Sequence, residues 1–156
     1  MNKKPTEEAI KSILPVAKET YTSLREDKGA DRPVLNVTWT KLAECTETMT
    51  RGILNPGSEA FKFCREILLI SAKHELPRPD PKYDKDYKTP HWSPAPRNEA
   101  AQGLPWLSVR QVDPEILKAI SDLVHDKVPS VRYLVTRELF RLYSNAKETF
   151  WSLAKD

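Results

Sequence analysis

The chain has 156 residues, 39% hydrophobic and 30% charged, a composition typical of one globular domain and not of a disordered segment. Its 25 basic and 22 acidic residues are spread evenly, so the sequence shows no basic stripe of the kind that binds nucleic-acid phosphates. Four glycines are too few for a glycine-rich phosphate loop, and so low a number favours helices over sheets.

We expect a cytoplasmic protein with no part in a membrane. The longest aliphatic run, residues 67–70, is much shorter than the ~20 residues of a membrane-spanning helix. Residues 1–8 lack the apolar stretch of a signal peptide. Cys45 and Cys64 fall on apolar faces of two predicted helices, so we expect small buried hydrophobic residues and not a disulfide.

The hydrophobic pattern predicts one all-α domain over 1–156, with N-terminal helices in 1–78, a proline-rich loop in 79–96 and further helices in 97–156. In the first part, apolar residues recur at three- and four-residue steps, as on one face of a helix. The predicted apolar faces are Ile10, Ile13, Leu14, Ala17, Tyr21 and Leu24; Trp39, Leu42, Cys45, Met49 and Ile53; and Phe61, Cys64, Ile67, Leu68 and Ser71.

These faces predict helices over about 6–28, 37–54 and 58–75. Pro15 removes a backbone hydrogen bond, which predicts a kink in the first helix or its division into two. The turn before Ser58, a plausible N-cap, makes the second and third helices an antiparallel hairpin.

The segment from Leu76 to Pro96 contains six of the chain's 13 prolines and cannot be helical throughout. Its length exceeds that of most connections between helices, and such long loops are often functional. We expect it to pack against the helices, because its aromatic side chains favour burial. The contact residues predicted here are Tyr83, Tyr87, His91 and Trp92.

The C-terminal part predicts a second helical hairpin. Asp113 and Pro114 are a strong helix start, with aspartate as the cap and proline at the first helical position. Residues 126–130 interrupt the pattern, and a second helix begins at Val131. The apolar positions are Ile116, Leu117, Ile120, Leu123 and Val124, then Val131, Leu134, Val135, Leu139 and Leu142.

This hairpin resembles a HEAT repeat. The resemblance rests on Asp126, Pro129, Val131 and Arg132 in the turn, followed by Val135, Leu139 and Leu142. Aligning Arg97 with Arg132 brings Ala100, Leu104 and Leu107 onto Val135, Leu139 and Leu142, so the segment that begins at Pro96 looks like the second helix of a preceding unit. Pro105, which interrupts that helix, and the long loop before it depart from the family pattern.

The resemblance implies a right-handed stack of antiparallel hairpins, a HEAT-like α-solenoid of about six or seven helices. It also implies a non-catalytic protein-binding or scaffold segment that acts through the surface of the second helices. The partner would be another protein or further domains of the same protein. The turn arginine Arg132 would pair with Asp126, and Arg97 with a neighbouring acid.

The last predicted helix carries Phe150, Trp151 and Leu153, with Trp151 on a predicted core face. Asn145 and Glu148 have the spacing of a capping box at its start. This helix either packs back as a cap or continues into a longer stack. We favour the second alternative, in which the chain is a segment of a larger bacterial multidomain protein.

Three residues of the C-terminal hairpin are predicted to contact a partner: Tyr133, Arg137 and Arg141. The sequence predicts no catalytic residue, no cofactor and no metal site. His74, His91 and His125 have no second ligand at a zinc-like spacing.

Two other interpretations remain open. A helical-repeat DNA glycosylase would use aromatic side chains and a carboxylate, for which the chain offers Trp39, Trp92, Trp106 and Trp151, and Asp113 or Asp126. A regulatory segment of a large ATPase or defence protein rests on fold analogy alone.

Overall fold

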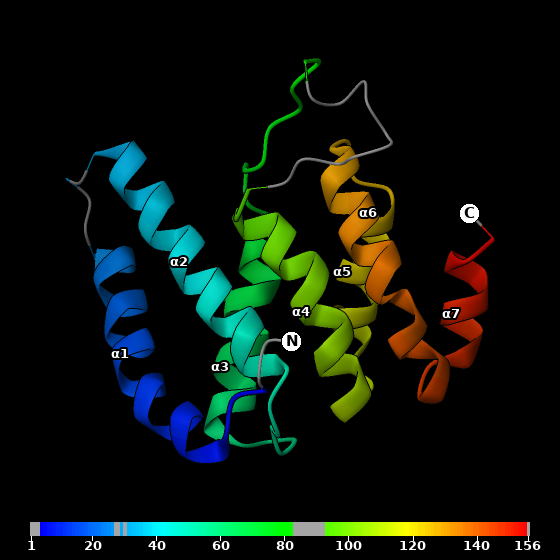
Figure 1. Ribbon diagram of the computed structural model, residues 1–156, viewed down its shortest axis with the longest axis horizontal. Helices are drawn as coiled ribbons and strands as arrows, with labels where there is room; N and C mark the ends of the chain where they lie inside the picture. The colour runs from blue at the N-terminus through cyan, green and yellow to red at the C-terminus, as the bar shows by residue number, and fades with distance from the viewer. Residues whose placement is uncertain (1–3, 27–28, 30, 83–92, 156) are drawn as a thin grey trace.

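The computed structural model describes residues 4–26, 29, 31–82 and 93–155 (Figure 1). Within these ranges the chain forms seven α-helices and one 3-10 helix, and no β-strand. The expected all-helical class is therefore confirmed for the part of the chain that is described. The helices are α1 Glu7–Glu26, α2 Arg32–Thr50, α3 Glu59–Ser71, α4 Pro96–Arg110, α5 Pro114–Val124, α6 Pro129–Glu138, η1 Leu139–Ser144 and α7 Lys147–Leu153.

Helix α4 lies at the centre and contacts α2, α3, α5 and α6 (Figure 1). Helix α1 packs on α2 and α3 at one end of the molecule, and α7 packs on η1 and α5 at the other end. None of the described helices is long and apolar enough to span a membrane.

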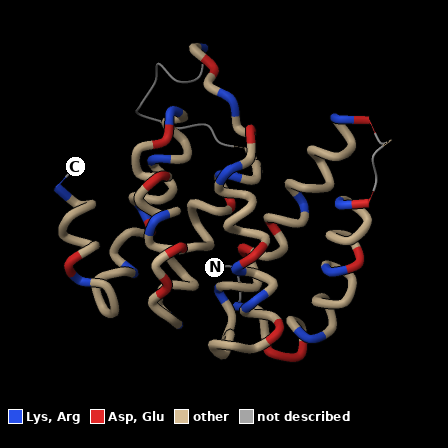
Figure 2. The backbone as a smooth tube through the Cα atoms, turned by 180° about the vertical axis from the view of Figure 1, so that it is seen from behind, with Lys and Arg blue, Asp and Glu red and all other residues tan. Residues whose placement is uncertain are grey.

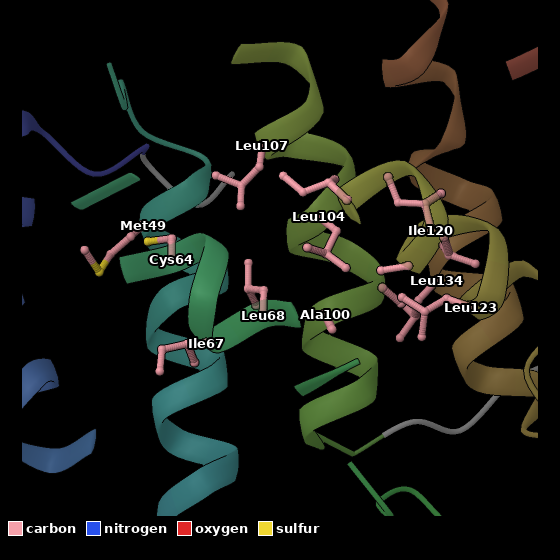
Figure 3. Packing of buried hydrophobic residues seen from close by; sticks show 14 of the residues in the cluster. Met49, Cys64, Ile67, Leu68, Ala100, Leu104, Leu107, Ile120, Leu123 and Leu134 are labelled. Atoms are coloured by element: carbon pink, nitrogen blue, oxygen red, sulfur yellow. The ribbon is translucent and has the colours of Figure 1, made fainter. Parts of the chain in front are cut away.

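The core lies on both sides of α4, as Figure 3 shows. Ala100, Leu104 and Leu107 are fully buried along this helix. Residues from α2 and α3 cover one side and residues from α5 and α6 the other. These include Met49, Cys64, Ile67 and Leu68 on the first side and Ile120, Leu123 and Leu134 on the second.

The apolar faces are confirmed most completely in α3, where all five predicted residues are buried. Two residues of the predicted N-terminal faces are exposed, Ile13 by 43% and Ile53 by 68%. Ile53 lies beyond the end of α2, so the helical spacing no longer applies to it. Both cysteines are free thiols: Cys64 is buried as expected, and Cys45 is half-buried.

Both internal prolines lie within continuous helices. Pro15 is inside α1, so the alternative of two shorter helices is wrong. Pro105 is inside α4 and does not interrupt it, contrary to the expectation from the repeat pattern. A proline in a helix interior costs about 3 kcal/mol. In α4, where 11 of 15 residues are buried, contacts on all sides offset that cost.

Two helix boundaries differ from the prediction. Helix α2 begins at Arg32 and not near residue 37, because Pro33 can occupy the first turn, where an N–H group has no partner within the helix. The predicted second helix of the C-terminal hairpin gives way to the 3-10 helix η1 at Leu139.

The predicted capping box is wrong. Helix α7 is capped at Ala146 without a side-chain hydrogen bond. The Asn145 amide instead donates to the Val109 carbonyl oxygen at 2.7 Å, which ties this turn to the end of α4. Trp151, expected on the core face of α7, is 49% exposed.

Candidate functional site

The turn before α6 is held by the residues that the repeat pattern singles out, although their pairing differs from the prediction. Arg132 donates through Nη1 to the backbone oxygen atoms of Asp126 and Lys127, at 2.6 and 3.2 Å. The Asp126 carboxylate accepts the Val128 N–H at 2.8 Å. The expected ion pair between Arg132 and the Asp126 carboxylate is therefore replaced by contacts with backbone oxygens.

The Asp126 carboxylate pairs instead with Arg97 of α4, whose Nε lies 3.3 Å from Oδ2. This Nε makes no hydrogen bond of good geometry, so the contact is an ion pair only. A second guanidinium nitrogen of Arg97 donates to the Pro77 carbonyl oxygen. The expectation that Arg97 pairs with a neighbouring acid is confirmed, and Arg97 fixes the end of α4 to the α5–α6 turn.

Tyr133 and Arg137 lie one turn apart on the exposed side of α6, as predicted. Tyr133 is 43% exposed. The Arg137 guanidinium bonds the Gln102 amide oxygen at 2.8 Å and Glu138 at 3.1 Å while its side chain stays partly in solvent. Both residues line a hollow of about 400 Å³, together with Pro129, Arg132 and Thr136.

A second hollow of about 470 Å³, here called the α6–α7 groove, lies on the other side of α6. Arg132, Thr136 and Arg137 line both hollows, so this part of α6 is a ridge between them. His125 adds a third basic residue to the groove, and none of its described lining residues is a carboxylate. The remaining lining residues are Val124, Leu139, Phe140, Phe150, Leu153 and Ala154.

Arg141 does not belong to this exposed surface, which corrects the prediction. Its side chain is 18% exposed, with the guanidinium carbon 3.3 Å from the centroid of the Trp106 ring. Its Nε lies 2.7 Å from the Glu138 carboxylate. A 3-10 helix turns by more per residue than an α-helix, so the change at Leu139 moves Arg141 off the face that Arg137 occupies.

The same change leaves Phe140 58% exposed beside the groove. Nearby, the rings of Tyr143, Phe150 and Trp151 contact one another edge to face, with centroids 5.0 to 6.2 Å apart. Sequence reasoning assigned Trp151 to a core face and missed this cluster. The available signal was the concentration of aromatic residues between positions 140 and 151.

The other four predicted contact residues belong to the proline-rich loop. Tyr83, Tyr87, His91 and Trp92 lie outside the described residues. Among the residues that are described, no group of three or more His, Cys, Asp or Glu side chains could hold a metal ion.

The tryptophans and carboxylates of the glycosylase interpretation are engaged separately. Trp39 stacks on Tyr21, and Trp106 lies under Arg141. Asp113 caps α5 and binds Arg65. Basic and acidic positions are mixed along the α-helices, as Figure 2 shows, so no described α-helix carries charges of one sign only.

A pair of buried carboxylates lies between α2 and α4. Glu47 is 3% and Glu99 6% exposed. Burial, then the charges of Glu47 and Glu44, raise the pKa of Glu99 to about 7. Burial also raises the pKa of Glu47, although its bond of 2.6 Å to Arg51 acts in the opposite direction. Neither residue lines the hollows beside α6, so this pair belongs to the helix interface.

Comparisons with known proteins find no match: no protein family, no curated protein and no solved structure is similar to this chain.

Proposed function

We propose that this chain is a non-catalytic binding module, a HEAT-like stack of helical hairpins that holds another protein or a further domain on its α6 surface. The arrangement of the helices supports this. Helices α2, α4 and α6 form one row, in which α4 contacts both of the others. Helices α3 and α5 form a second row. Helix α3 contacts α2 and α4, and α5 contacts α4 and α6, so each helix of this row packs against two helices of the first. Stacked hairpins produce two such rows.

The observation that carries the proposal is the ridge of α6 between two hollows. A side chain of the partner can enter either hollow, while the ridge contacts the part of the partner that lies between the two hollows. Phe140, which is 58% exposed, and Phe150 line the groove, and aromatic residues are enriched where proteins bind one another.

The charges around the groove indicate the chemistry of the partner. Arg132, Arg137 and His125 line it, and none of its described lining residues is a carboxylate. An amphipathic helix with acidic residues beside its apolar face would match both features, because such a helix lays its apolar side chains into a groove while its charges meet the rim. The proposed partner segment is therefore an acidic amphipathic helix.

The test uses a pair of designed peptides with the same apolar residues at helical spacing, one with glutamate and one with lysine at the flanking positions. Each is titrated into the ¹⁵N-labelled chain. We expect the acidic peptide to shift the amide signals of α6, η1 and α7, and the basic peptide to bind at least about tenfold more weakly. Equal binding of both peptides, or shifts confined to α1 and α2, would contradict the proposal.

A pair of variants separates the groove from general charge effects. Phe140→Ala removes an exposed aromatic ring from the groove, and we expect it to weaken binding of the acidic peptide severalfold. Lys11→Ala removes one positive charge from α1, at the other end of the molecule, and should leave the affinity within about twofold because screening weakens distant charges.

A further inference from the structure

A pocket of about 500 Å³ lies between α1, α2 and α3, far from the α6 surface in sequence and on the other side of α4. We call it the α1–α3 pocket. Its volume falls within the range of about 300–1,000 Å³ found for small-molecule sites. Tyr21, Trp39, Arg25, Arg32 and His74 line it, together with Asn36 and three aliphatic side chains.

One wall of the α1–α3 pocket is aromatic and fixed in place. The rings of Tyr21 and Trp39 are stacked, 5.9 Å apart with an angle of 18° between their planes. Tyr21 also meets the edge of Phe63 at 6.2 Å, and its hydroxyl donates to Glu66 at 2.7 Å. Because these contacts hold both rings in place, a planar ligand can pack against the parts of these half-buried rings that line the pocket, with little freedom lost on binding.

The charges at this pocket favour an anion. Arg25 and Arg32 both line it, and none of its described lining residues is a carboxylate. Arg32 bonds Glu75 at 2.8 Å, but Glu75 also accepts from Arg78 at 2.7 Å, so one carboxylate serves two guanidinium groups. The Arg25 guanidinium carbon lies over the Tyr21 ring, 5.6 Å from its centroid, so this charge is adjacent to the aromatic wall.

His74 adds a polar group without adding charge. Its Nδ1 accepts the Leu76 N–H at 3.1 Å, which places the proton of the neutral ring on Nε2. Burial, the largest influence, lowers the pKa of His74, so the ring is neutral at pH 7. The ring centroid lies 6.4 Å from that of Trp39, next to the aromatic wall.

We infer that the α1–α3 pocket binds a small planar aromatic ligand that carries one carboxylate. The ring of the ligand lies against Tyr21 and Trp39, and its carboxylate meets Arg25 and Arg32. An aromatic wall and a pair of guanidinium groups within one pocket match the two halves of such a ligand. This site is independent of the proposed binding of a protein at α6.

The probes are indole-3-acetate and its neutral analogue indole-3-acetamide, which differ only in the charged group. Each is titrated into the ¹⁵N-labelled full chain, and the indole N–H signal of Trp39, assigned with Trp39→Phe, is followed. A ligand of this size binds with a Kd of about 1 mM if it gains ~0.3 kcal/mol per heavy atom. We expect indole-3-acetate to shift the Trp39 signal at this concentration and the acetamide to bind at least about tenfold more weakly.

Three variants locate the binding. Arg25→Gln and Arg32→Gln should each weaken indole-3-acetate severalfold. Lys11→Gln removes one positive charge from α1 at a residue that does not line the pocket and should leave the Kd within about twofold. The proposal is overturned if the acetamide binds as well as the acetate, if the two arginine variants bind like the unchanged chain, or if no saturable shift of Trp39 occurs.

Discussion

Glu99 is a carboxyl group buried in the interface between α2 and α4, with a pKa raised to about 7 from 4.5. Because the folded chain holds this proton more tightly than the unfolded chain does, the free energy of unfolding falls as the pH rises from about 4.5 to about 7. Above about pH 7 the ionised Glu99 lowers the free energy of unfolding by its full amount. Glu99→Gln removes the charge while keeping the shape.

We expect Glu99→Gln to raise the free energy of unfolding by about 1–3 kcal/mol at pH 8 and to change it little at pH 4.5. Urea unfolding at both pH values measures the difference. Glu19→Gln, at an exposed position of α1, is the control and should stay within about 0.5 kcal/mol. An equal effect of Glu99→Gln at both pH values would show that its charge is not the cause.

Arg137 and Arg141 have the same side chain and different surroundings. Arg141 lies over Trp106 and pairs with Glu138, which is only 8% exposed. We expect Arg141→Ala to lower the free energy of unfolding by about 1–3 kcal/mol, because it loses a cation–π contact and leaves a buried carboxylate less well paired. Arg137→Ala should cost less than about 1 kcal/mol. Similar losses in the two variants, measured in urea, would contradict this assignment.

At the scale of the helices, Asp113 both caps α5 and links α5 to α3. Its Oδ1 accepts the N–H groups of Glu115 and Ile116 at the start of α5, at 2.9 and 3.2 Å. Its Oδ2 accepts from Arg65 of α3 at 2.7 Å, and this contact lowers the pKa of Asp113. Ser58 caps α3 through the Phe61 N–H alone, at 3.2 Å.

These two caps give a matched comparison. We expect Ser58→Ala to cost about 1 kcal/mol and Asp113→Ala about 2–3 kcal/mol, because only the second also breaks the link between α3 and α5. Asp113→Asn keeps the cap and should lie between them. Thermal unfolding of the three variants measures these differences in stability. Equal effects of Ser58→Ala and Asp113→Ala would exclude a stabilising role for the Arg65 contact.

The sequence predicts helices well where local signals agree. In α3 and α5 an N-cap residue precedes a regular apolar face, and both the cap and the buried residues are observed. It fails where packing decides. Pro105 is tolerated because α4 is enclosed on all sides, and Asn145 bonds Val109 of α4 and does not cap α7. Both outcomes depend on contacts between helices, which no local sequence pattern indicates.

At the scale of the whole molecule, the candidate sites lie on opposite sides of α4. The α6 surface was predicted in part, because Tyr133 and Arg137 are exposed on a regular helix. The groove itself could not be predicted, since it exists only where α7 packs on η1 and α5. The α1–α3 pocket likewise combines residues from three helices, and the sequence pattern assigned Tyr21 and Trp39 only to a buried face.

The most direct test of the binding module is a charge exchange at the α6–α7 groove. The affinities of the acidic and basic amphipathic peptides are measured for the unchanged chain and for Arg137→Glu by isothermal titration. We expect the unchanged chain to prefer the acidic peptide by at least about tenfold, and Arg137→Glu to abolish or reverse this preference. The same preference in both proteins, or no binding of either peptide to the unchanged chain, would contradict the account.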